Sequence, residues 1–168
     1  IGGHQLSGAM MDPRGLAELM PDFLEQGFPF HYQCTEVYTW AMTPNRVITI
    51  PVTPPPFVNH GNYAISLSDV VKWLGAKAEE RGIEIYPGFA AVDLIYSDDG
   101  AVTGVVTGDM GVERDGSHGP AFAPGMALMG KYVLIGEGAR GSLAKKLVAR
   151  FGLDADREPG KYGIGLKE

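Results

Sequence analysis

The chain has 168 residues, of which 45% are hydrophobic and 20% charged, and its formal net charge is −6. This length suits one domain or part of one, and the acidic balance excludes a surface of clustered Lys and Arg, so we expect no nucleic-acid partner. The one cysteine, Cys34, excludes an internal disulfide and an all-cysteine metal or cluster site within these residues.

Hydrophobic periodicity and turn residues predict short helices and strands. Apolar residues three and four positions apart indicate helices at 68–81 and 142–151, each followed by a glycine that can end it, Gly82 and Gly152. An Asp-Gly pair between two β-branched runs predicts a hairpin around Gly100. In the first half of the chain we expect one short helix at 12–24, or two broken at Pro21, then paired strands at 35–42 and 46–52 and a helix at 68–81 capped by Ser68 or Asp69. In the second half we expect a strand at 83–86, paired strands at 90–96 and 101–107, a loop at 108–124, an edge strand at 126–128, a buried strand at 131–135, a helix at 142–151 and a strand beginning at 162. This order predicts an α/β fold with antiparallel β-hairpin insertions.

A glycine-rich turn follows the predicted strand at 131–135. Gly136, Gly138 and Gly141 lead into the helix that begins at Ser142. Such glycines let the backbone approach a ligand, and the unpaired N–H groups of a helix N-terminus favour an anion such as a pyrophosphate. Many α/β proteins use a similar turn only to reverse the chain, so these residues by themselves leave both interpretations open.

The same turn carries a family resemblance. Ile-Gly-Glu-Gly-Ala-Arg-Gly-Ser at 135–142 resembles the second FAD fingerprint of flavoprotein hydroxylases and geranylgeranyl reductases, although the acid there is usually Asp and the serine comes one residue sooner. Together with this turn, four further stretches resemble the electron-transfer flavoprotein:ubiquinone oxidoreductase family in order and spacing. These stretches are 2–9 with 12–14, 59–63, 82–91 and 162–168. The resemblance implies that residues 1–168 are an internal piece of a Rossmann-like FAD-binding domain of the hydroxylase and geranylgeranyl reductase type.

The resemblance also implies a function and a set of cofactor contacts. The full-length protein would be an oxidoreductase that passes electrons from its partner, reduced electron-transfer flavoprotein, through FAD and a 4Fe-4S cluster to ubiquinone. The isolated chain should be inactive, because the first βαβ unit of the FAD site is expected before Ile1 and the cluster ligands far downstream. The residues expected near FAD are Gly136, Glu137, Gly138, Ala139 and Arg140 at the pyrophosphate turn, Ala90 and Ala91 toward the adenine end, and Ser7 and Gly8 toward the flavin ring. No residue is assigned as a catalytic acid or base, and none as a metal ligand.

The segment 35–58 is apolar and nearly uncharged. Between Gln26 and Ser68 the only charged residues are Glu36 and Arg46, and four prolines at 51 and 54–56 exclude a membrane-spanning helix of about 20 residues. The residues alone favour core strands, whereas the family resemblance favours a hairpin whose tip enters one leaflet of a membrane. The quinone or membrane contacts expected on this basis are Trp40, Ile48, Ile50, Phe57, His60 and Tyr63.

Other interpretations accompany this one. His60 is equally well explained as a loop residue that hydrogen-bonds the backbone. A FAD-dependent monooxygenase or geranylgeranyl reductase relative, and a non-catalytic membrane-binding module, are the alternative functions. The resemblance implies a monotopic, peripheral position on the membrane surface of the bacterial cytoplasmic membrane or of the mitochondrial inner membrane.

Overall fold

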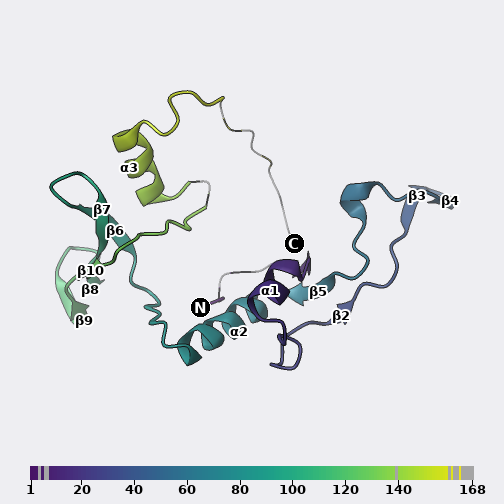
Figure 1. Cartoon of the computed structure of the whole chain (residues 1–168), viewed down its shortest axis with the longest axis horizontal. Helices are drawn as coiled ribbons and strands as arrows, with labels where there is room; N and C mark the ends of the chain where they lie inside the picture. Colours follow the sequence, from purple (N-terminus) through teal and green to yellow (C-terminus); the bar gives the residue numbers. More distant parts are fainter. Residues whose placement is uncertain (4, 6–7, 139, 159, 161–162, 164–168) are drawn as a thin grey trace. The chain divides into compact units, whose positions relative to one another are not determined.

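The computed structural model describes residues 1–3, 5, 8–138, 140–158, 160 and 163 (Figure 1). The chain divides into two compact units, Ile1–Pro87 and Gly88–Glu168. In both units the strands pair antiparallel and the helices are few, so the fold is mixed α/β.

The first unit is built on a three-stranded sheet. In chain order its elements are β1 (Gly8–Met11), α1 (Arg14–Leu19), β2 (Tyr32–Gln33), β3 (Thr39–Thr43), β4 (Arg46–Ile50), the short 3-10 helix η1 (Pro55–Phe57), β5 (Tyr63–Ser66) and α2 (Leu67–Glu80). β5 lies between β1 and β2 and is antiparallel to both. β3 and β4 form a separate hairpin, which confirms the strand pair expected around residues 43–45.

The core of this unit packs on one face of the sheet. Tyr63 and Ile65 alternate with outward-facing residues along β5 and are both buried, because successive strand residues point to opposite faces. The rings of Phe23, Phe28 and Tyr63 meet edge to face, at centroid distances of 5.2–6.1 Å. The buried cluster is Met20, Phe23, Phe28, Tyr63, Ile65 and Val70.

A side-chain cap and a glycine conformation set the two ends of α2. The hydroxyl of Ser66 accepts a hydrogen bond from the N–H of Asp69 at 3.4 Å, so Ser66 is the N-cap. The expected cap at Ser68 or Asp69 is therefore wrong by a few residues, because Ser68 instead donates its hydroxyl to the carbonyl of Gly2. The expected end is confirmed: Gly82 has φ +77°, the left-handed conformation that closes a helix.

The second unit contains a second three-stranded sheet, a hairpin and one helix. Its elements are β6 (Ala91–Tyr96), β7 (Val102–Thr107), β8 (Met110–Val112), β9 (His118–Ala123), β10 (Ala127–Met129) and α3 (Ser142–Phe151). β7 lies between β6 and β10, which confirms the expected hairpin and edge strand. α3 has the bounds expected from the sequence and ends at Gly152, where φ is +60°.

Two predicted strands are absent from the described residues. Residues 83–86 and 131–135 have no strand assignment, and the side chains of Tyr132 and Leu134 are 89% and 95% exposed. A strand takes its hydrogen bonds from a neighbour, and no described ladder provides one here. The expected buried strand at 131–135 is therefore wrong for this chain by itself.

Two further expectations are wrong, and a third concerns residues that are mostly outside the described ones. The loop expected at 108–124 forms the β8–β9 hairpin, which turns at Gly116 with φ +86°. The helix expected at 12–24 ends at Leu19, and residues 21–27 form turns. Of the strand expected to begin at residue 162, only Gly163 is among the described residues.

Candidate functional site

The glycine turn of the second unit connects residues 131–135 with α3. Gly138 has φ +75°, a conformation that residues with a side chain rarely adopt, and a Cβ at Gly136 or Gly138 would meet nothing within 4 Å. Space around the turn is therefore open, as a backbone approach to a ligand requires. Glu137 and Arg140 are exposed, and Ala139 lies outside the described residues.

Glu137 folds back onto the start of α3. Its Oε2 accepts hydrogen bonds from the N–H groups of Leu143 and Ala144, both at 2.9 Å. The N-cap residue of α3, Gly141, has no side chain to perform this role. The carboxylate thus binds N–H groups that a helix leaves without an internal partner, at the end where the helix dipole favours negative charge.

This turn has the features of an anion-binding turn. The first N–H groups of α3 hold an anionic oxygen, here that of the Glu137 carboxylate, and the glycines leave open space beside it. The N–H groups at this helix start were expected to be unpaired, whereas two of them are bonded to Glu137. The sequence could not reveal that pairing, because an acid six residues before Leu143 is not a standard capping spacing.

Ala90 and Ala91 lie in the same unit, where β6 begins. The carbonyl of Ala90 accepts a hydrogen bond from Gly108 at 2.9 Å, and Ala91 pairs with Thr107. The next residues are attached to α3, because the Lys146 ammonium donates to the carbonyl of Val92 and to Asp93, both at 2.9 Å. The hydrogen bond from Lys146 holds the pKa of Asp93 below its usual value.

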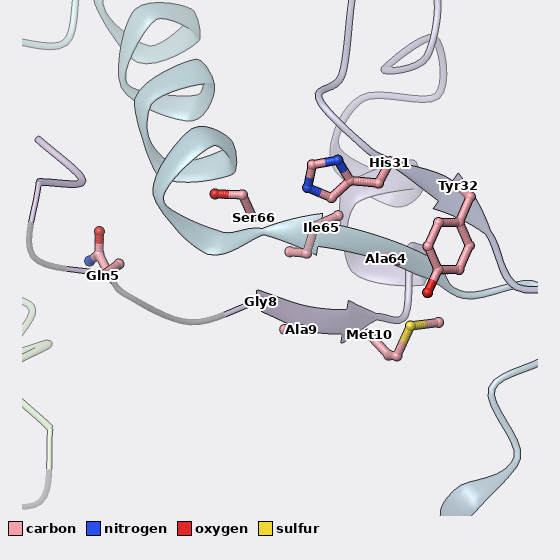
Figure 2. A pocket seen from close by; sticks show the side chains of 9 residues that line it. All are labelled: Gln5, Gly8, Ala9, Met10, His31, Tyr32, Ala64, Ile65 and Ser66. Carbon is pink, nitrogen blue, oxygen red and sulfur yellow. The ribbon is translucent and has the colours of Figure 1, made fainter. Parts of the chain in front are cut away.

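The first unit has its own pocket on the outer face of the sheet, with a volume of about 670 Å³ (Figure 2). Pairing of Gly8 with Ser66 and of Met10 with Ala64 places these four residues on the face opposite the core. Because three of them are small, the floor of the pocket is low and flat. The pocket is lined by Gln5, Gly8, Ala9, Met10, His31, Tyr32, Ala64, Ile65 and Ser66.

Polar side chains surround this flat floor. In Figure 2 the His31 and Tyr32 rings project over β5 from the β2 side, and Gln5 stands at the other end. Imidazole, phenol and amide groups around small residues can hydrogen-bond the edge of a planar, carbonyl-bearing ring. Gly8 was expected near a flavin ring, whereas His31, Tyr32 and Gln5 were not predicted as site residues. His31 and Tyr32 stand in a short polar and aromatic alternation at 30–33, and Gln5 stands in the stretch 2–9 that carries the family resemblance. Ser7 lies outside the described residues.

The β3–β4 hairpin exposes apolar side chains on both faces. Register pairs Trp40 with Thr49 and Met42 with Val47 on one face, and Ala41 with Ile48 and Thr39 with Ile50 on the other. The side chains of Trp40 and Ile48 are each 55% exposed. The expected contacts Trp40, Ile48 and Ile50 therefore do not share a face. Tyr38 stacks on Trp40, and its hydrogen bond to the Glu36 carboxylate raises the pKa of the Tyr38 phenol, which keeps the hydroxyl protonated.

Of the remaining expected contacts, Phe57 and His60 lie at the surface and Tyr63 lies in the core. Phe57 is exposed in η1, and the ring Nδ1 of His60 donates to the carbonyl of Thr35 at 2.7 Å, as expected of a backbone-binding loop histidine. Tyr63 is 7% exposed and belongs to the core. The structure therefore removes Tyr63 from the candidate surface contacts, because its ring packs edge to face against Phe23 and Phe28.

Neither a metal-ligand group nor a membrane-spanning helix is present among the described residues. These residues contain no group of three or more His, Cys, Asp or Glu that could hold a metal ion. No helix among them combines the length and apolar composition needed to cross a bilayer.

Comparison with known proteins gives whole-chain matches. No protein-family model matches the chain. Its sequence is 47% identical to a probable electron transfer flavoprotein-ubiquinone oxidoreductase of Acinetobacter baylyi, over all of this chain and 30% of that protein. It is 44% and 46% identical to the mitochondrial electron transfer flavoprotein-ubiquinone oxidoreductases of Bos taurus and Dictyostelium discoideum, over 27% and 28% of their lengths. The chain thus spans less than a third of these curated relatives.

Proposed function

Over its whole length the chain matches one segment of the electron transfer flavoprotein-ubiquinone oxidoreductase family, and from this premise we propose that it forms part of a flavoprotein of that activity. The complete protein takes electrons from reduced electron-transfer flavoprotein and delivers them, through FAD and a 4Fe-4S cluster, to ubiquinone. The observation that carries this proposal is identity of 44–47% to the bacterial and mitochondrial relatives across every residue of the chain. The activity belongs to the complete protein, of which these residues supply one segment.

In this proposal the segment is part of a Rossmann-like FAD-binding domain. The glycine turn and the first N–H groups of α3 hold the diphosphate, and the strand start at Ala90 and Ala91 passes the adenine end. FAD supplies the capacity to accept and release electrons, while the polypeptide positions it and excludes competing reactions. Support comes from the open turn at Gly138 and from the anion-binding geometry of Leu143 and Ala144.

Within the first unit, we propose the pocket on the β1–β5–β2 sheet as a binding site for a planar ring such as a flavin. Its flat floor of Gly8, Ala64 and Ser66 accommodates a planar ring, and Gln5, His31 and Tyr32 provide hydrogen-bonding groups at the rim. Neither a general acid nor a general base is required, because the electrons pass between cofactors.

The β3–β4 hairpin supplies the membrane contact. Both of its faces are apolar and exposed, and a stacked Tyr38 and Trp40 suit the headgroup level of a bilayer. Contact is monotopic, on the bacterial cytoplasmic membrane or the mitochondrial inner membrane, where the quinone resides. Arg46 lies beside the turn, and its long side chain lets the guanidinium extend back from the apolar region toward the headgroups.

The test is a donor and acceptor assay on the complete protein. We expect purified protein to carry bound FAD and to reduce a ubiquinone analogue when reduced electron-transfer flavoprotein is the donor. NADPH in place of electron-transfer flavoprotein is the matched control, and it should give no turnover. Turnover with NADPH alone would favour a monooxygenase or geranylgeranyl reductase relative, and a complete protein without flavin would favour a non-catalytic module.

A further inference from the structure

The two chain segments that lead to and from the β3–β4 hairpin are held together at its base. β2 and β5 pair as far as Gln33 and Tyr63. Pairing then continues past both strands, because Cys34 donates its N–H to the carbonyl of Asn62 and Gly61 donates to the carbonyl of Cys34, each at 2.8 Å. The side-chain amide of Gln33 also donates to the carbonyl of Gly61, at 3.2 Å. We call residues 34–35 and 59–62 the neck of the hairpin.

His60 adds the last rung of the neck with its side chain. The ring Nδ1 lies 2.7 Å from the carbonyl oxygen of Thr35. Because a carbonyl oxygen only accepts, this contact requires the proton on Nδ1. Within the described residues, the next main-chain rung is that of Thr39 with Ile50 in the hairpin itself. The imidazole therefore closes the pairing at the end from which the hairpin leaves.

A tight turn places His60 opposite Thr35. Asn62 donates its N–H to the carbonyl of Asn59 at 3.0 Å and its side-chain amide to the Asn59 Oδ1 at 3.1 Å. Gly61 has φ +85°, as the third residue of a type II turn requires. The position of the imidazole is thus set by hydrogen bonds of the chain itself.

The hairpin has little else to hold it in place. The β3–β4 sheet is separate from the β1–β5–β2 sheet. Every residue of β4 is exposed, as is every residue of β3 except Thr39. A hairpin that buries so little surface is not fixed by packing, so its direction depends on the hydrogen bonds at its base.

We propose that His60 is a positioning residue, which restricts the directions of the β3–β4 hairpin so that the hairpin meets the membrane already ordered. This inference rests on the proposed function, since it takes the hairpin as the membrane contact. Without the rung, the segment after Thr35 separates from the turn, and binding must then order it. The net contribution of one hydrogen bond corresponds to roughly twofold to tenfold in the binding constant.

Two variants of nearly equal shape test the role of the ring. His60→Asn keeps an N–H donor at the place of Nδ1, since both nitrogens are bonded to Cγ, whereas His60→Leu puts a methyl group there. In the complete protein, His60→Leu should weaken co-sedimentation with liposomes roughly twofold to tenfold, and His60→Asn should bind as the unchanged protein does. His118→Leu, the same exchange at an exposed histidine of β9, is the matched control and should leave binding unchanged.

Amide hydrogen exchange without liposomes measures the neck directly. His60→Leu should speed exchange at Cys34 and Gly61 roughly twofold to tenfold, and His60→Asn should not. Exchange at Ile65, inside β5, should stay unchanged in both variants, because the loosening is confined to the neck. Faster exchange at Ile65 as well would mean that His60 stabilises the whole unit, and would overturn the inference.

Two further results would overturn it. A side chain that itself enters the lipid gives the reverse order, with Leu binding at least as well as His and Asn binding less. Unchanged liposome binding by His60→Leu, despite faster exchange at the neck, would mean that the rung does not order the hairpin for the membrane. Failure of the proposed membrane contact is recognised separately, because Met42→Asp and Ile48→Asp would then leave liposome binding intact.

Discussion

Gly138 combines a left-handed main-chain conformation with a place in the proposed cofactor-binding turn. Its φ of +75° lies in the left-handed region, which costs a β-branched side chain about 1–3 kcal/mol. A side chain would meet no neighbour there, so the effect of a substitution comes from the backbone and not from crowding within the chain.

Gly138→Val in the complete protein should therefore move the turn and lower FAD content, to less than about half of normal occupancy given a 1–3 kcal/mol strain. The measurement is the flavin-to-protein absorbance ratio after purification. Gly116→Val is the matched control, because Gly116 has φ +86° and equally open surroundings in the β8–β9 turn. Normal flavin occupancy in Gly138→Val would remove the turn from the cofactor site.

At the same scale, residue chemistry shows what a pattern can and cannot predict. The acid at Glu137 is evident in the sequence, and its place between glycines indicated an anion-binding turn. Its hydrogen bonds to Leu143 and Ala144 depend on how the turn folds back, which no local pattern specifies. His31 and Tyr32 were not predicted either, because their place in the pocket lining depends on the pairing of β2 with β5.

At the scale of elements, Asp-Gly pairs predict hairpins more reliably than polar composition predicts loops. The Asp-Gly pair at Gly100 correctly predicted the β6–β7 hairpin, and Gly100 has φ +86°. The same pair at Asp115 and Gly116 forms the β8–β9 hairpin, although polar composition suggested a loop. Turn residues therefore outweighed composition, because φ above zero at glycine sets the reversal whatever the flanking residues are.

The β3–β4 hairpin gives a prediction at this scale. Met42→Asp and Ile48→Asp place one charge on each face of the hairpin, and each should weaken co-sedimentation of the complete protein with liposomes. A charge in the apolar part of a bilayer costs a few kcal/mol, so the expected loss is about tenfold or more.

Val112→Asp, the same apolar-to-acidic exchange at an exposed residue of β8 in the other unit, is the control and should leave co-sedimentation unchanged. Unchanged binding in both hairpin variants would exclude the hairpin as the membrane contact. Weakening by only one of them would show that a single face meets the lipid.

At the scale of the whole molecule, apolar surface is poorly covered. Among the described residues more large apolar side chains are exposed than buried, including Leu134 and Tyr132 beside the glycine turn. The relatives are more than three times as long as this chain, which leaves ample polypeptide to cover such surfaces in the complete protein.

The 168 residues alone should therefore unfold at low temperature and without a sharp transition, and should bind a hydrophobic dye before heating. Circular dichroism during heating, together with dye fluorescence, measures both properties. The complete protein is the comparison and should melt sharply. A cooperative, high-temperature transition of the 168 residues as a monomer would contradict this expectation.

The sequence by itself determined the features that depend on neighbours within a few residues. These include α3 with its end at Gly152, the end of α2 at Gly82, the hairpin at Gly100 and the glycine turn before Ser142, because i to i+4 hydrogen bonds and φ preferences are local. Only the tertiary structure decided that Tyr63 is core, that Trp40 and Ile48 face opposite ways, and that Glu137 caps α3. Those outcomes depend on strand register, packing and the path of a turn, which bring together residues that local preference cannot place.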